Sequence, residues 1–219
     1  MAETRKSLQS EISANYRWWQ HVATDLLLAG AVVAFALSRI EGLTAADLTT
    51  IPLAFLVANL GEYLLHRFPM HRPMPPREIY RRHTLCHHVF FTQDRMGMDS
   101  LRDLRWILFP AYSVPGLVLI MIPVAATVGA LATANAGWLC LVVTACYYLM
   151  YEFLHTAYHL SPEGFIGRQR AIAYLRTLHQ DHHDPRLMGS WNFNITFPIW
   201  DIIIGTWYRR GAGAAATPR

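Results

Sequence analysis

The sequence predicts an all-α integral membrane protein, with about four transmembrane helices and a cytoplasmic helical cap that holds a histidine-rich site for two metals. Three observations predict this. The 219-residue chain is 53% hydrophobic and 16% charged, whereas an ordinary soluble domain is about 25% charged. No Asp, Glu, Lys or Arg lies between Arg105 and Glu152, a stretch that accommodates two spans of about 20 residues each. Ten of the eleven histidines fall into four tight groups. The length favours one domain over residues 1–219.

The elements follow in order along the chain. Residues 1–21 are polar, and we expect a helix along the membrane surface, with Trp18 and Trp19 in the interfacial aromatic belt. Four apolar stretches with few charges are interpreted as spans: about 22–40, 46–66, 106–129 and 136–156. The cap comprises 67–105 and 157–210, in which 195–208 is too interrupted to span and is expected to dip into the interface. We expect a flexible tail from Gly211.

The basic residues indicate which side of the membrane holds the cap. Arg5, Lys6 and Arg17 precede the first span, and further arginines fill the loop 67–105 and the C-terminal region, whereas only Arg39 lies on the other side. Basic residues near span ends stay cytoplasmic. Both termini and all four histidine groups are therefore expected in the cytoplasm. The net charge of +4 fits contact with anionic lipid, and no aromatic-basic pattern suggests a nucleic-acid partner.

The four histidine groups contain more imidazoles than one ion can hold. They are His66 with His71; His83, His87 and His88; His155 with His159; and His179, His182 and His183. Neutral imidazole is a good ligand for iron, zinc and copper. The sequence therefore predicts two metal ions at one end of the helices. His21 belongs to no group, and we interpret it as a polar anchor at the interface.

Helical spacing predicts which histidines share a face. Residues four apart stack on an α-helix, which applies to His155 with His159 and to His83 with His87. By the same rule the triple at 179, 182 and 183 would face a single site. On a continuous helix His88 points away from His83 and could reach the second metal. His66 and His71 would splay, unless Pro69 ends the helix and lets His71 turn back.

Acidic residues accompany the histidines. Glu62 and Glu152 lie about one turn before His66 and His155, and Asp181 and Asp184 flank the last group. A metal-bound histidine usually donates its other N–H to a carboxylate or a carbonyl. These four acids are candidates for that supporting role. The alternative is solvation of a helix end for Asp184 and contact with lipid head groups for the others.

Taken together, these motifs resemble the fatty acid hydroxylase / sterol desaturase superfamily of membrane di-iron enzymes. The resemblance covers roughly residues 55–208. It runs through the stretch from Glu62 to His71, the stretch from Tyr80 to His88, the pairs and triples that follow, and the closing Asn192-Phe193, Trp200-Asp201 and Gly205-Thr206. It implies that the ten grouped histidines are the ligands of two iron ions, with zinc as a substitute in purified protein, and that Asn192 joins the supporting residues.

The resemblance also implies the activity. Such an enzyme hydroxylates a C–H bond of a lipid (a fatty acyl chain, a sterol or a related lipid) with O2, and no catalytic residue is expected beyond the metal ligands. The chain carries no recognisable heme, flavin or nicotinamide module. Electrons are therefore expected from an external donor, such as a ferredoxin or a cytochrome with its reductase, attracted by the basic face.

Other functions remain open at the level of sequence. The same site would serve a lipid desaturase or a carotenoid-ring hydroxylase. A metal transporter or sensor is a more distant alternative, because an ion pathway should place its ligands at mid-membrane depth. A bis-histidine heme protein fits less well still. Five aromatic residues are candidates for a substrate pocket wall, although ordinary packing explains most of them: Trp106, Trp138, Tyr147, Tyr148 and Tyr151.

Overall fold

The computed structural model describes residues 2–210, and in that range it is helical, with a single isolated bridge between Thr92 and Arg95 in place of any strand. This confirms the all-α class. The tail expected from Gly211 lies outside the described residues. The chain forms two compact units. The cap unit contains residues 2–16, 59–108 and 153–210, and the span unit contains 17–58 and 109–152.

Four helical stretches are long and apolar enough to cross a membrane, as expected: Trp18–Ser38, Ala45–Met70, Ser113–Leu131 and Ala134–Tyr158. The third begins later than the expected residue 106. A short 3-10 helix η3 (Leu101–Trp106) precedes it, and α7 starts at Ser113. Pro110 explains the delay, because proline lacks an N–H and disfavours helical backbone in the residue before it.

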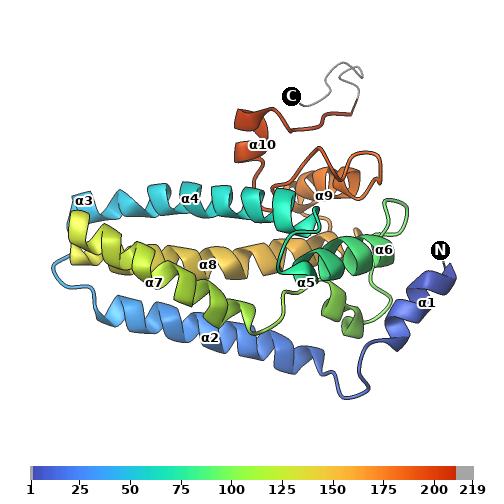
Figure 1. Ribbon diagram of the computed structural model, residues 1–219, viewed down its shortest axis with the longest axis horizontal. Coiled ribbons are helices and arrows are strands. Elements are labelled where there is room, and N and C mark those ends of the chain that lie inside the picture. The colour runs from blue at the N-terminus through green and yellow to red at the C-terminus, as the bar shows by residue number, and fades with distance from the viewer. Residues whose placement is uncertain (1, 211–219) are drawn as a thin grey trace. The chain divides into compact units, whose positions relative to one another are not determined.

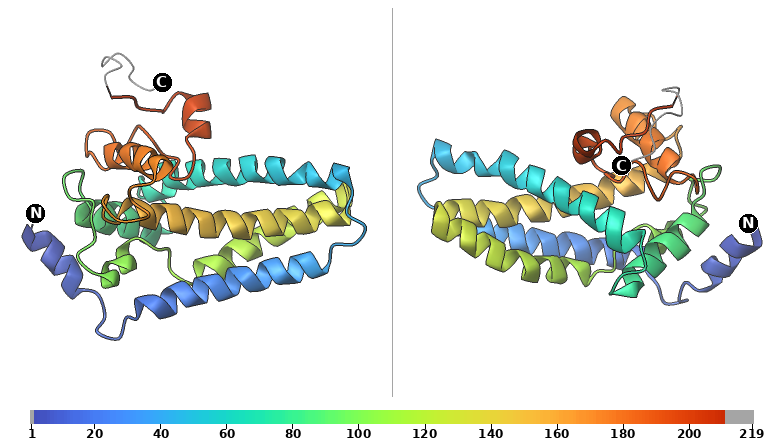
Figure 2. Two further views of the ribbon diagram at one scale, coloured as in Figure 1. Left: turned by 180° about the vertical axis from the view of Figure 1, so that it is seen from behind. Right: turned by 45° about the horizontal axis from the view of Figure 1, so that its top comes forward.

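The span unit is built from α2 (Trp18–Ser38), α3 (Ala45–Leu48), the first part of α4 (Thr50–Leu65), α7 (Ser113–Leu131) and most of α8 (Ala134–Tyr158). Helices α2, α7 and α8 lie side by side (Figures 1 and 2) and bury Ala29, Val114, Ala145 and Tyr148 between them. Small residues allow this close approach. A Cβ placed on Gly137 would lie 2.6 Å from the carbonyl oxygen of Ala125.

The cap unit is made of short elements around the ends of α4 and α8 (Figure 1). In chain order they are α1 (Ala2–Ser10), η1 (His66–Met70), α5 (Arg77–Tyr80), η2 (Arg81–His87), α6 (His88–Phe90), η3, α9 (Arg170–His182) and α10 (Ile199–Ile204). The helix expected over residues 1–21 ends at Ser10, and the next helix begins at Trp18.

Two of these elements, η1 and η2, are π-helices. A π-helix closes its hydrogen bonds between residues five apart, whereas an α-helix closes them between residues four apart. Each π-helix continues directly from an α-helix, α4 before η1 and α5 before η2. Both carry histidines, so their unusual periodicity decides which histidines face the same way.

Candidate metal centre

The grouped histidines meet inside the cap unit in two clusters. The five-histidine group contains His66, His71, His83, His88 and His182, and the four-histidine group contains His87, His159, His179 and His183. Within each group, one ring nitrogen per residue lies within 4.8 Å of all the others. His155 adjoins the four-histidine group, since its Nε2 lies 3.2 Å from Nε2 of His87. All are buried except His71, which is half-buried.

The contacts within the five-histidine group all join Nε2 atoms. His83 Nε2 lies 2.8 Å from that of His66 and 3.1 Å from that of His88. His71 Nε2 lies 3.2 Å from that of His66 and 2.9 Å from that of His182. The same nitrogen of each ring therefore points to a common centre.

The four-histidine group repeats this pattern. His183 Nε2 lies 3.1 Å from the Nε2 atoms of both His87 and His179. His179 Nε2 lies 3.2 Å from that of His159. With His155 beside His87, this arrangement also gathers one nitrogen per ring around one point.

Backbone carbonyls fix the tautomer of five rings. A carbonyl oxygen only accepts a hydrogen bond, so the Nδ1 that it contacts must carry the proton. In the five-histidine group, His66 Nδ1 donates to Phe193 O and His182 Nδ1 donates to Trp191 O at 2.8 Å. The Nε2 of each ring is then a bare lone pair directed at the common centre.

The other three carbonyls serve the four-histidine group. The Nδ1 atoms of His87, His159 and His183 donate to the carbonyl oxygens of Trp106, Met96 and Phe91 at 2.9, 2.8 and 2.5 Å. His87 and His183 consequently present two lone pairs to each other at 3.1 Å. Two acceptors at this distance repel each other unless a cation lies between them.

The histidines do not supply that cation by protonation. Burial lowers the pKa of His87 to about 3 and that of His182 to about 4. Burial, followed by the nearby histidine charges, lowers the pKa of His83 and His88 well below the usual value. The rings are therefore uncharged at neutral pH, which is the form that binds metals.

The donor set and its spacing fit transition-metal ions. Metal–imidazole bonds are about 2.0–2.1 Å long, so two ligands at right angles are separated by about 3 Å. The Nε2 distances in both groups, 2.8 to 3.2 Å, match that spacing. Neither group includes a carboxylate or a thiolate. An all-imidazole set suits iron, zinc or copper and does not suit magnesium or calcium.

The π-helices divide the histidines differently from the expectation. His83 and His88, five apart, share the five-histidine group, whereas His87 belongs to the other group. The α-helical rule had paired His83 with His87. Likewise His66 and His71 meet across η1, which contains Pro69 as an internal residue. Pro69 does not simply end the helix, because the π-helical turn already brings residues five apart together.

The last triple is also divided. His179 and His183, four apart, stay in the four-histidine group, while His182 faces the five-histidine group. One step along a helix turns the side chain by about 100°, so His182 and His183 can address neighbouring centres. The triple thus joins the two groups and does not face a single site. The expected pair His155 and His159 does stay on one side.

The four candidate acids have partners away from the imidazoles. Glu62 accepts hydrogen bonds from the N–H groups of Ile195 and Thr196, and Glu152 accepts one from the N–H of Phe109 at 2.9 Å. Glu62 also accepts a hydrogen bond from Thr196 Oγ1 at 2.6 Å, and backbone carbonyls contact the Nδ1 atoms of five of the histidines.

The two aspartates pair with arginines. Asp181 lies 2.6 Å from Nη2 of Arg210, and Asp184 lies 2.6 Å from Nη2 of Arg186. Asn192 acts on the backbone, because its side chain donates to Leu178 O at 3.2 Å and accepts from the N–H of Tyr208 at 2.9 Å. Its φ of 54° places it in the left-handed region, which asparagine tolerates better than most residues. These residues therefore shape the chain around the histidines and do not contact the rings.

Sequence reasoning gave no role to Asp201, which the structure buries completely. Its carboxylate accepts hydrogen bonds from the N–H groups of Phe193 and Asn194 at 3.0 and 2.7 Å and from Thr206 Oγ1 at 2.7 Å. It thereby holds the residue whose carbonyl orients His66. An acid inside the apolar run from Ile195 to Ile204 was the available signal.

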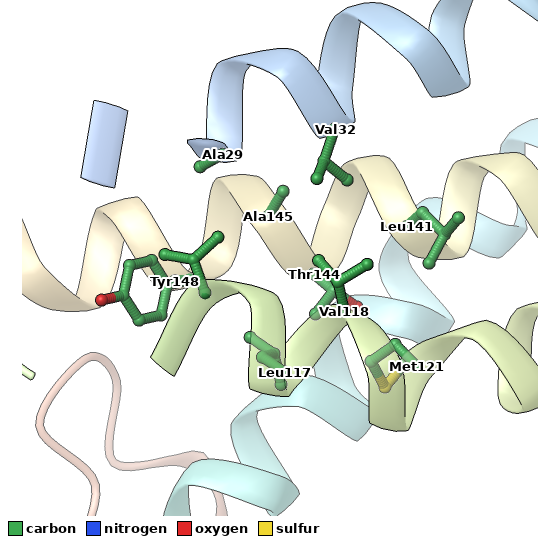
Figure 3. A pocket seen from close by; sticks show the side chains of 10 residues that line it. Ala29, Val32, Leu117, Val118, Met121, Leu141, Thr144, Ala145 and Tyr148 are labelled. Atoms are coloured by element: carbon green, nitrogen blue, oxygen red, sulfur yellow. The ribbon is translucent and has the colours of Figure 1, made fainter. Parts of the chain in front are cut away.

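The remaining candidates, except Trp106 in the cap unit, lie in the span unit. His21 Nε2 donates to Phe109 O at 2.8 Å and lies 3.8 Å from Asp25, and its role as a polar anchor at the membrane interface stays a prediction. A narrow apolar cleft lies between α2, α7 and α8 (Figure 3). Among the five aromatic residues considered for a pocket wall, Tyr148 lines this cleft.

A family model described as fatty acid hydroxylase matches residues 51–206. No curated protein and no solved structure matches the chain. The matched range covers more than half of the chain, includes all ten grouped histidines, and begins after α1 and α2.

Proposed function

Because the chain belongs to the fatty acid hydroxylase family, we propose that it is a membrane oxygenase that converts a lipid C–H bond to an alcohol. The balanced reaction consumes one O2, two electrons and two protons, and it releases one water with the hydroxylated lipid. The observation that carries this proposal is the pair of inward-facing Nε2 clusters, which gather uncharged imidazoles around two centres.

Two iron ions, one in each group, would supply the O2 activation and the redox chemistry, for which zinc is unsuited. The ten histidines His66, His71, His83, His87, His88, His155, His159, His179, His182 and His183 would hold them. The protein's part is to present Nε2 lone pairs from buried rings, to fix their tautomers through backbone carbonyls, and to keep bulk water away from the centres. No histidine is left over for acid–base catalysis.

The family and the composition of the chain support a proposal for the substrate class and the partners. Four apolar helices make it a membrane protein, so a lipid within the bilayer is the natural substrate. We place both termini and the cap on the cytoplasmic side, because basic residues dominate the corresponding segments. A separate reduced protein, a ferredoxin or a cytochrome with its reductase, would deliver the electrons.

The test is a lipid mass spectrum of cells that express the intact chain, compared with cells that express His182→Ala. His21→Ala is the matched control, since that ring lies in the span unit. We expect one added oxygen on a lipid class in the intact chain and in the His21 variant, and none in His182→Ala. Loss of two hydrogens would instead indicate a desaturase.

An iron count on the purified chain accompanies the lipid analysis. We expect two iron ions per intact chain and fewer in His182→Ala. Purified protein that binds neither iron nor a substitute such as zinc would contradict the proposal, as would full activity in His182→Ala.

A further inference from the structure

Helix α1 lies outside the matched residues 51–206, yet it belongs to the cap unit, and one of its side chains contacts the segment 90–99. Arg5 is only 3% exposed. Its Nη1 donates to Phe90 O at 3.0 Å, its Nη2 donates to Gly97 O at 2.7 Å, and its Nε pairs with Asp99 at 3.0 Å. The guanidinium also lies 4.1 Å from the centre of the Phe90 ring. The planar fork of one arginine therefore joins two backbone positions seven residues apart.

The segment that Arg5 contacts contains a turn. The chain reverses between Phe91 and Met96, where the N–H of Arg95 donates to Thr92 O at 2.9 Å. Arg5 contacts the residue just before this turn and the residue just after it. Its two hydrogen bonds thus hold the turn closed at its base.

The same turn carries two of the carbonyls that orient histidines. Phe91 O accepts from His183 Nδ1 at 2.5 Å, and Met96 O accepts from His159 Nδ1 at 2.8 Å. Both rings belong to the four-histidine group. Each of these carbonyls is one residue away from a carbonyl that Arg5 contacts.

We propose that Arg5 is a positioning residue of the four-histidine group, acting through the carbonyls of Phe91 and Met96. The inference rests on the proposed metal site. Arg5 closes the turn, the turn presents the two carbonyls, and these orient His183 and His159 with their Nε2 lone pairs inward. Helix α1 is then part of the metal centre, although it lies outside the matched range.

Anchoring of α1 alone does not require this arrangement. Leu8 and Ile12 are also buried, and Arg102 Nη2 donates to the carbonyl oxygens of Ile12 and Ser13 at 3.3 and 3.0 Å. A buried guanidinium is costly unless its donors are satisfied. Arg5 satisfies them on the segment that supports the histidines, whereas Arg102 holds the α1 side without touching that segment.

The experiment is a cobalt titration of the metal-free, full-length protein, followed by visible absorption. His182→Ala and His183→Ala each remove one ligand from one group, and they identify the spectral component that belongs to each ion. Arg5→Gln is the test variant. Lys6→Gln removes a charge from the exposed side of the same helix, and Arg102→Gln loosens α1 without touching the turn.

We expect two cobalt ions in the intact chain. In Arg5→Gln, the component missing from His183→Ala should bind about 10- to 100-fold more weakly, which is the usual effect of losing a supporting contact. The component missing from His182→Ala should be unchanged. Lys6→Gln and Arg102→Gln should titrate as the intact chain does. If Arg5→Gln does not fold, Arg5→Lys replaces it, and it should show the same selective loss because one ammonium cannot span both carbonyls.

Three outcomes would overturn the inference. Arg5→Gln could bind both ions as the intact chain does, it could weaken the component of the five-histidine group, or Arg102→Gln could weaken the same ion equally. The last result would assign the effect to docking of α1 in general. An intact chain that binds no cobalt would overturn the proposed metal site itself, which is a different result from a selective loss.

Discussion

Acid should destabilise the metal-free protein steeply, because its buried histidines stay uncharged in the folded state. Burial is the largest cause that lowers the pKa of each of the eight grouped histidines outside the spans, among them His87 and His182 with values of about 3 and about 4. In an unfolded chain the pKa of each would be about 6.5. As the pH falls below 6.5, the unfolded state binds protons that the folded state does not bind. The free energy of unfolding therefore decreases until the folded pKa values are reached.

The expected size follows from the number of groups. Between pH 7.5 and 5.5, one histidine that cannot be protonated in the folded state removes about 1.4 kcal/mol of stability. Eight such groups would remove about 11 kcal/mol by the same reasoning, which is comparable to the whole stability of a typical domain, about 5–15 kcal/mol. The cluster should therefore open between pH 5 and 6. Bound metal should delay this opening, because it competes with protons for the same Nε2 lone pairs.

The assay is the melting temperature of the metal-free protein in detergent, measured at intervals from pH 7.5 to 5.0 and repeated after metal loading. His21→Ala serves as the control and should follow the same curve, since this ring is not among the eight. A decrease in stability no larger than that of a single histidine, about 1.4 kcal/mol between pH 7.5 and 5.5, would refute the reasoning. It would show that the rings are accessible to protons in the folded protein.

Two substitutions test supporting contacts in the two units. Asp201→Asn keeps the shape of the side chain but weakens its charge-assisted hydrogen bonds, among them the one from the Phe193 N–H. We expect the free energy of unfolding, measured by melting, to decrease by about 3 kcal/mol. The cobalt component of the five-histidine group should be lost as well. Gly137→Ala would place a methyl group 2.6 Å from Ala125 O, which should cost about 1–3 kcal/mol. Gly30→Ala meets nothing within 4 Å, and it should leave the melting temperature unchanged or slightly raised. Equal effects of the two glycine substitutions would contradict the packing described for α7 and α8.

The membrane helices were predictable because their signal is spread over many residues. An apolar run of about 20 residues is recognised as a span even when its predicted ends are misplaced by a few residues. The sequence contains four such runs, and the structure contains four such helices. The third start was misplaced by seven residues, from 106 to Ser113, since apolar composition continues through the loop around Pro110. Hydrophobicity therefore located the spans, and local backbone chemistry set their limits.

The grouping of the histidines was predictable, but their division between two centres was not. The α-helical rule paired His83 with His87, whereas the π-helix pairs His83 with His88. A period of five is rare, so spacing alone favoured the common helix. The repeated gap of five, in His66 with His71 and again in His83 with His88, was the signal that could have indicated it.

Contacts made by the backbone escape sequence reasoning altogether. Every residue has a carbonyl, so nothing in the sequence marks those of Phe91, Met96 or Phe193 as partners of histidines. We expected acids that lie nearby in the sequence to fill this role, but backbone carbonyls fill it for five of the rings. Arg5 was noted only as a topology signal, since its contacts lie 85 to 94 residues away in the chain.

The π-helices make the number of residues between histidines as important as the histidines themselves. Deletion of one residue between His83 and His88 would leave all ten grouped histidines in the chain, yet the two would then lie four apart on a segment wound for five. An insertion between His66 and His71 would have the corresponding effect. Comparisons that count histidines, or that allow gaps freely within these two segments, would treat such chains as equivalent. A gap-free spacing of five at both positions is therefore the feature by which chains with the same division of ligands can be recognised.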